Sequence, residues 1–179
     1  MITGKQFAEQ ACSTQYDKIK YSNLDCQAFV ERVLYDAGCR KADGSAYNWR
    51  GSNSMWRNAL SWKGTKDECI QKYGSIPAGA WVFMLNFDGG EKEKGYNDNQ
   101  GNATHVGIYV GDDLTRDSTR NTSGRDGVGY RPLKDWNRVG LCKYLDYNIS
   151  NKDNNIERSK EIINYFRALL DELERMIIE

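Results

Sequence analysis

The sequence is poor in the residues that most often build metal and disulfide sites. Among 179 residues there is one histidine, His105, so no pair of imidazoles is available to hold a metal ion. The cysteines are odd in number, form no CxxC pair and lack metal-like spacing, which argues against a closed disulfide framework and a zinc site. We therefore expect no cofactor and at least one free thiol among the five cysteines, Cys12, Cys26, Cys39, Cys69 and Cys142.

Long apolar runs and an excess of one charge are also missing. No stretch approaches the roughly 20 apolar residues that a membrane-spanning helix needs, and the N-terminal residues lack the apolar core of a secretion signal. The 25 basic and 25 acidic residues cancel, so no overall field favours nucleic acid or an anionic membrane. The sequence therefore predicts a protein that is synthesised in the cytoplasm without a signal peptide, binds no nucleic acid and does not insert into a membrane.

The clearest helical pattern begins at Cys26. Asp25 is a typical N-cap residue, and Gly38 is placed where a helix commonly ends. Between them the apolar residues fall on one helical stripe: Phe29, Val30, Val33, Leu34 and Ala37. This spacing predicts an amphipathic helix over 25–37 with Cys26 in its first turn.

Helical patterns come first along the chain and extended patterns come later. A capped helix is expected to begin after Thr3 and a short one to cover 67–73, whereas 79–85 and 104–110 have the composition of strands. A chain of this length, with 39% hydrophobic residues, is long enough to form one domain with a real core. The order of the patterns predicts an α+β domain in which N-terminal helices pack on a small antiparallel sheet.

Alternation along the second strand separates His105 from the apolar side chains. Successive side chains of a strand point to opposite faces, so the apolar residues at 106, 108 and 110 share one face. His105 shares the other face with Gly107 and Tyr109. The imidazole is therefore expected opposite the most apolar face of this strand.

The turn after this strand decides which residue lies next to His105. If residues 111–113 form a three-residue loop, Asp117 lies opposite Gly107 and diagonal to His105 on the same face. A two-residue loop would shift the register by one and bring Ser118 into that place. Because Asp-Asp is a poor two-residue turn, we favour the longer loop and Asp117 as the partner of the imidazole.

Cys26 and His105 together suit nucleophilic attack on an amide. The thiolate would attack the carbonyl carbon, while the imidazole takes the thiol proton and later gives it to the leaving amine. A helix N-terminus stabilises an anion by only about 0.3 to 1 kcal/mol, so a neighbouring imidazolium must supply most of the activation. The backbone N–H of Cys26 is also placed to stabilise a developing oxyanion.

A series of short motifs follows one another along about residues 4 to 140. They are Tyr21, Asp25-Cys26-Gln27-Ala28-Phe29-Val30, Ala37-Gly38, Ile76-Pro77-Ala78-Gly79-Ala80-Trp81-Val82-Phe83, His105-Val106-Gly107-Ile108-Tyr109-Val110-Gly111 and Asp117-Ser118. In this order they resemble the NlpC-type cell-wall cysteine peptidases, a family with phage endolysin members. The resemblance implies a minimal papain-like fold and hydrolysis of the bond between D-γ-glutamate and the diamino acid in peptidoglycan stem peptides.

The resemblance also implies the catalytic roles. Cys26 would be the nucleophile, His105 the general base, and Asp117, twelve positions further on, the residue that orients the imidazole. That family usually has His, Asn or Gln at the third position, so Asp117 departs from the common pattern. The simpler role for Asp117 is that of a solvated hairpin residue.

Substrate contacts follow from the same resemblance. Tyr21 would line the substrate pocket, and Asp25 would meet the free α-amino group of the first alanine of the stem. Gln27 is assigned to substrate binding with them. The chain has Gln27-Ala28 where the family commonly has Ser-Gly, and Ala80 where it commonly has Asp. The alternatives are a plain N-cap role for Asp25 and a packing role for Tyr21.

Two other functions are open at this point. An N-acetylmuramoyl-L-alanine amidase of related fold would use Cys26 and His105 without needing Asp25 to meet a free amine. A non-catalytic muropeptide-binding or assembly module would keep the fold and leave Cys26 unreactive. The absence of a secretion signal favours a phage or prophage lysin that acts at the bacterial cell wall after release, with an injected toxin or a tail-associated lysin as the next option.

The chain divides into three expected parts. Residues 1–147 form the catalytic domain, 148–155 a polar linker, and 156–179 an amphipathic helix. Apolar residues of that helix recur at three- and four-residue spacing: Ile163, Phe166, Leu170, Leu173 and Ile177. The helix is expected to dock on its own domain, form a homodimer or lead to a wall-binding domain. The glycine-rich loop 86–103 is expected to be either a wall or lid of the cleft or a surface insertion.

Overall fold

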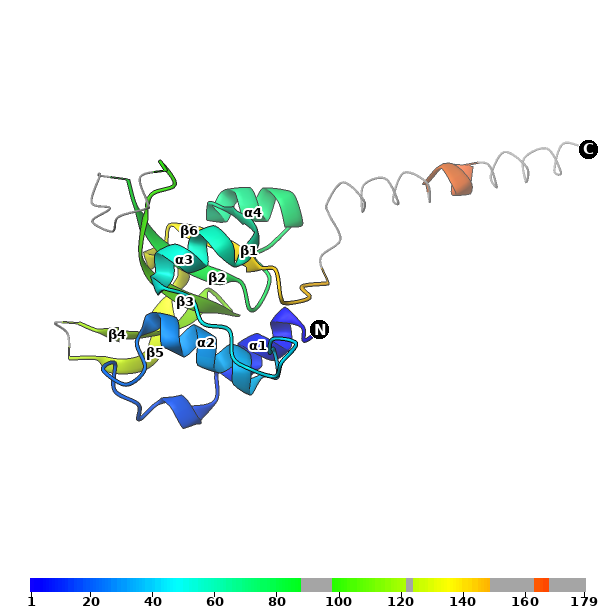
Figure 1. The fold of residues 1–179 in the computed structure, drawn as a ribbon. Helices are drawn as coiled ribbons and strands as arrows, with labels where there is room; N and C mark the ends of the chain where they lie inside the picture. The colour runs from blue at the N-terminus through cyan, green and yellow to red at the C-terminus, as the bar shows by residue number, and fades with distance from the viewer. Residues whose placement is uncertain (88–97, 122–123, 149–162, 168–179) are drawn as a thin grey trace, which may run out of the picture.

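One six-stranded antiparallel sheet forms the centre of the fold (Figure 1). The computed structural model describes residues 1–87, 98–121, 124–148 and 163–167. The main elements are α1 (Gly4–Ala11), α2 (Cys26–Asp36), α3 (Gly51–Asn58), β1 (Leu60–Gly64), α4 (Lys66–Tyr73), β2 (Trp81–Asn86), β3 (Asn102–Gly111), β4 (Leu114–Arg120), β5 (Asp126–Pro132) and β6 (Arg138–Cys142), with short 3-10 helices at Thr14–Tyr16 and Leu133–Asp135. The strand order is β1-β6-β2-β3-β4-β5. The α+β prediction is confirmed.

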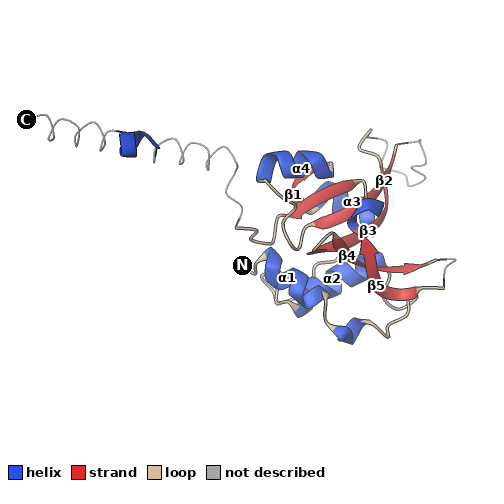
Figure 2. Cartoon of the chain, turned by 180° about the vertical axis from the view of Figure 1, so that it is seen from behind, coloured by secondary structure: helices blue, strands red, loops and turns tan. Residues whose placement is uncertain are grey.

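Two apolar clusters cover the two faces of this sheet. The larger one packs α1, α2 and α3 against β2 and β3, and the smaller one packs α4 and the 133–136 segment against β2 and β6. Both views show α4 at a distance from α1 and α2, with strands between them (Figure 2). Strand β2 contributes to both clusters, since Trp81 and Phe83 lie in the first and Val82 in the second. A strand buried on both faces has an uninterrupted apolar sequence, as 79–85 has.

Helix α2 begins and ends close to the predicted limits. The Asp25 side chain accepts a hydrogen bond from the backbone N–H of Ala28 at 2.8 Å, which caps the first turn. Gly38 follows the helix with φ of 90°, a conformation that costs glycine little. The apolar stripe of the helix is buried in the larger cluster. Burial of this stripe fixes the direction of α2, and thereby the position of Cys26 at its start.

The β3–β4 pairing places Asp117 on the same face as His105. The register pairs Ile108 with Arg116, and one step further along it sets Gly107 opposite Asp117. Asp117 is therefore diagonal to His105, as the sequence predicted, and Ser118 lies on the opposite face.

The turn of this hairpin is shorter than predicted, and a bulge compensates for the difference. Gly111 pairs with Leu114, so the turn consists of Asp112 and Asp113 alone. Both have positive φ, 51° and 56°, as a type I′ turn requires and as aspartate tolerates. The register shifts between 109 and 111, which leaves Val110 as the extra residue of a β-bulge. The bulge restores the register that a three-residue loop would have given.

The predicted alternation along β3 is confirmed. Val106 and Ile108 are fully buried in the larger cluster, beneath the helices. Gly107 and His105 face the other way, toward Trp136 of the smaller cluster. A Cβ at Gly107 would come within 2.9 Å of the Trp136 ring, so glycine at this position allows the indole to lie close to the strand.

Part of the expected organisation lies outside the described residues. This holds for 88–97 in the expected loop before β3, for the linker after Asn148, and for all of the expected C-terminal helix except 163–167, which is helical. Within this helical segment, 163–167, the side chains of Ile163 and Phe166 are exposed. Among the described helices, none has the length and apolar character needed to cross a bilayer.

Candidate active site

Cys26 lies at the start of α2, where the preceding segment is tied to the β4–β5 hairpin. Its side chain is buried, with 8% of the residue exposed. Asp17 accepts from Arg116 of β4 at 2.5 Å, and the carbonyl of Leu24 accepts from the hydroxyl of Ser118. The backbone N–H of Tyr21 donates to Asp126 of β5 at 3.2 Å. These contacts fix the segment that leads to Cys26 against the strand that carries Asp117.

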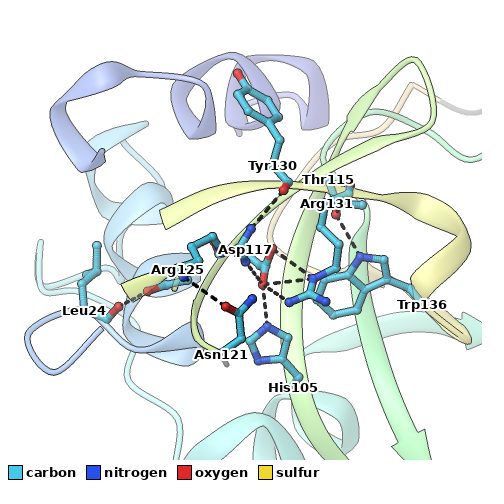
Figure 3. Close-up of polar contacts among 10 residues, drawn as sticks. Leu24, His105, Thr115, Asp117, Asn121, Arg125, Tyr130, Arg131 and Trp136 are labelled. Atoms are coloured by element: carbon cyan, nitrogen blue, oxygen red, sulfur yellow. Dashed lines mark hydrogen bonds and ion pairs between the residues drawn. The ribbon is translucent and has the colours of Figure 1, made fainter. Parts of the chain in front are cut away.

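The imidazole of His105 is held on two sides. Its Nε2 lies 2.7 Å from Oδ2 of Asp117 (Figure 3). The Trp136 ring stacks on it, with 5.3 Å between the ring centroids and 7° between the planes. Trp136 is itself held, because its Nε1 donates to the hydroxyl of Thr115 at 2.9 Å. The ring of His105 therefore has a fixed plane and a fixed partner for Nε2.

Cys26 and Asp117 are the two groups that raise the pKa of His105. Burial alone lowers the pKa of His105, but the hydrogen bond with Asp117, and the hydrogen bond and charge of Cys26, raise this pKa to about 9. Because Nε2 faces Asp117, Nδ1 is the nitrogen left for the thiol. The site thus brings together the three predicted catalytic residues in the order thiol, imidazole, carboxylate.

Asp117 is fully buried and has three cationic partners. Its Oδ2 accepts from Nη2 of Arg125 at 2.6 Å and from Nη2 of Arg131 at 3.2 Å, besides its contact with His105 (Figure 3). Burial alone raises the pKa of Asp117, but hydrogen bonds and charge from His105 and Arg125 outweigh it and lower this pKa overall. The carboxylate is therefore ionised at neutral pH, and the solvated role considered for it is wrong.

Three residues of this site were not predicted from the sequence: Arg125, Arg131 and Trp136. Arg131 pairs with Thr115 in the β4–β5 register, which sets it on the face of Asp117. Gly129 lies opposite Asp117, and a Cβ there would come within 2.9 Å of the Arg125 side chain. Recognising 126–132 as a strand paired with β4 would have revealed Arg131, but no local pattern indicates Arg125.

Tyr21 and Asp25 lie at the thiol end of the site. Burial, the charges of Cys26 and Asp25, and a hydrogen bond with Cys26 raise the pKa of Tyr21. The Tyr21 hydroxyl is thus a neighbour of the thiol. Asp25 is exposed and uses Oδ1 to cap α2. Its N-cap role is confirmed, and the exposed carboxylate is also accessible to a ligand.

Gln27 has a structural role that differs from the predicted one. Its Nε2 donates to Oε1 of Glu31 at 2.9 Å and to the carbonyl of Trp49, and its Oε1 accepts from the N–H of Gly51 at 2.6 Å. Glu31 also accepts from the N–H of Trp49 at 2.6 Å. The Gln27 amide therefore holds this loop on α2, and its role in substrate binding stays a prediction.

The arrangement suits thiol chemistry. Among the described residues, no three side chains of histidine, cysteine, aspartate or glutamate come together as metal ligands. Burial raises the pKa of the Cys69 thiol to about 11 and that of the Cys142 thiol to about 12. Neither of these shifts includes a histidine among its causes. The Cys26 thiol has an imidazole beside it, which is what a nucleophile requires.

The raised pKa of His105 leads to a prediction for the pH dependence of any reaction at this site. Any reaction in which the imidazolium of His105 donates a proton should slow as pH rises through about 9. The sign for folding is the same. The pKa of His105 is 6.5 in the unfolded chain and about 9 in the fold, so protonation of this ring stabilises the fold. The stabilisation is fully present below about pH 6.5 and is lost as pH rises through about 9. Measuring kcat/KM from pH 6 to 10 tests this expectation, and an alkaline limb near 6.5 would contradict it.

Comparisons with known proteins found no match to this chain among family models, curated proteins or solved structures.

Proposed function

We propose that the chain is a peptidoglycan hydrolase with a papain-like, NlpC-type catalytic domain. In this proposal it cleaves stem peptides at the bond between D-γ-glutamate and the diamino acid. The observation that carries the proposal is the set Cys26, His105 and Asp117, with the thiol at a helix start and Nε2 of the imidazole 2.7 Å from a buried carboxylate. This is the arrangement that thiolate attack on an amide needs.

The first half of the reaction forms a thioester. The Cys26 thiolate bonds to the carbonyl carbon, and the carbonyl electrons move onto oxygen. The backbone N–H of Cys26 is one of the groups that α2 leaves without an intrahelical acceptor, so it can donate to that oxyanion. As the tetrahedral intermediate collapses, the C–N bond breaks and the imidazolium of His105 gives its proton to the leaving amine.

The second half releases the acyl group. His105 takes a proton from water, the resulting hydroxide attacks the thioester carbon, and the C–S bond breaks. The products are a carboxylic acid, which loses its proton to solvent, and the thiolate of Cys26, which again faces the imidazolium. Asp117 stays ionised throughout and keeps Nε2 in its place.

Tyr21 and Asp25 support the choice of bond. Both lie beside Cys26, and the Asp25 carboxylate is exposed. An ammonium group on the second residue before the scissile bond, the alanine of the stem, would meet this carboxylate. A free alanine amine occurs in stem peptides that have already been released from the sugar, so the proposal favours such peptides over intact glycan strands.

Paired substrates test this choice. The defined peptide L-Ala-γ-D-Glu-diamino acid is offered with its amine free and with its amine acetylated, and cleavage after D-glutamate is measured by mass spectrometry. We expect the free peptide to be cut and the acetylated one to be cut at least about tenfold more slowly, since one charge-assisted contact is lost. Equal cleavage rates for the free and the acetylated peptide would show that Asp25 does not recognise the alanine amine. Cleavage of muramoyl peptides between the sugar and the alanine would instead show the amidase.

A further inference from the structure

The Asp117 carboxylate, which contacts His105, has more cationic partners than are needed to compensate its buried charge. Oδ2 of Asp117 receives three charge-assisted contacts, from His105, Arg125 and Arg131. One cation is enough to compensate a buried carboxylate, and each further cation must itself be desolvated. The second arginine therefore calls for a reason besides the stability of the ion pair.

The two arginines reach Asp117 from different parts of the hairpin. Arg125 precedes β5, and its Nη1 also donates to the carbonyl of Tyr130 at 3.0 Å, which holds the guanidinium in place. Arg131 lies within β5 and places its guanidinium 5.6 Å from the centre of the Trp136 ring, the ring that stacks on His105. Both side chains are mostly buried, with 23% and 20% exposed.

Charge sharing at one oxygen has a direct consequence for the imidazole. A carboxylate that faces an imidazolium alone stabilises the protonated ring strongly. Two guanidiniums at the same oxygen repel that proton and withdraw part of the carboxylate charge. The other titratable neighbours are Cys26, which favours the imidazolium, and Tyr21 beside the thiol. The balance of these groups sets how readily His105 releases its proton.

We propose that Arg125 and Arg131 are positioning residues that fix the Asp117 carboxylate on Nε2 of His105 and limit its hold on the imidazolium proton. The catalytic consequence rests on the proposed hydrolase function, because a ring that holds its proton less tightly is a better acid toward the leaving amine. The electrostatic part does not depend on any activity.

The single histidine of the chain makes the test direct. The imidazole carbon-bound proton signals in the NMR spectrum of the whole chain belong to His105 alone, so its titration is read without assignment. The variants are Arg125→Gln and Arg131→Gln, which remove the charge but keep a hydrogen-bond donor, and Arg125→Lys and Arg131→Lys, which keep the charge. Arg32→Met is the matched control, because Arg32 is exposed on α2 and pairs with Asp36.

Each glutamine variant is expected to raise the titration midpoint of His105 by about half a pKa unit or more. The lysine variants and Arg32→Met should stay close to wild type. With a peptide substrate, the glutamine variants should move the alkaline limb to higher pH and lower kcat about tenfold, with KM little changed.

Titration midpoints that are equal in the glutamine and lysine variants, or lower in the glutamine variants, would overturn the proposal. If one glutamine variant does not fold, the other and the lysine pair still decide the matter. A chain that shows the shifts without hydrolysing any peptide would retain the electrostatic inference and reject the proposed function.

Discussion

Replacing Cys26 with alanine is expected to abolish hydrolysis while leaving the fold intact. Removing the nucleophile of a catalytic set costs on the order of 10⁴-fold to 10⁶-fold in kcat. The thiol is one atom at the end of a buried cluster, so its loss should change the free energy of unfolding by only about 1 kcal/mol. Turnover of a defined stem peptide and thermal unfolding measure the two quantities separately.

Cys12→Ala is the matched control for this variant. Cys12 follows α1 and is partly exposed. Its replacement should leave turnover within about twofold of wild type. If Cys26→Ala retained more than about a hundredth of the wild-type rate, the nucleophile would have to be another group.

Replacing Asp117 with asparagine is expected to affect both stability and the pH profile. The variant keeps the shape but leaves two guanidiniums and an imidazole without their shared anion, and breaking a buried pair in this way costs about 3 to 5 kcal/mol. The pKa of Asp117 is lowered in the fold, so the stability that it supplies is present above about 3.8 and is lost as pH falls below it. Urea unfolding at pH 7 measures the loss.

The same variant should lower the pKa of His105. Asp117 contributes to raising that pKa to about 9, so the alkaline limb of activity should move down by about one unit or more. Asp112→Asn is the control, because Asp112 is an exposed turn residue whose positive φ suits asparagine. An unchanged limb in Asp117→Asn would show that the carboxylate does not act on the imidazole.

Periodicity was sufficient to predict the elements that carry Cys26 and His105. The stripe in 25–37 predicted α2, and alternation in 104–110 predicted which face of β3 holds His105. Both predictions depend on local patterns that burial selects directly. The partner of the imidazole was also predicted, but by an argument about loop length that the bulge at Val110 happens to satisfy in another way. Bulges leave little trace in a single sequence.

Contacts between distant segments were beyond the reach of local patterns. Arg125 and Arg131 reach Asp117 only because β5 pairs with β4, and 126–132 contains two glycines and a proline that obscure its strand character. The role of Gln27 depends on a loop more than twenty residues away in sequence. In both cases, polar side chains without an evident partner in the sequence make hydrogen bonds or ion pairs in the tertiary structure.

Digestion of stem peptides that an amidase has first released from purified peptidoglycan, with the products identified by mass spectrometry, tests the central claim most directly. Wild type and Cys26→Ala are compared under reducing conditions at pH 7 to 8, below the expected alkaline limb. We expect fragments that end in D-glutamate, released by the wild type alone. Uncut stem peptides after incubation with the folded wild-type chain, or the same fragments from both proteins, would contradict the assignment of Cys26 as the nucleophile of a wall endopeptidase.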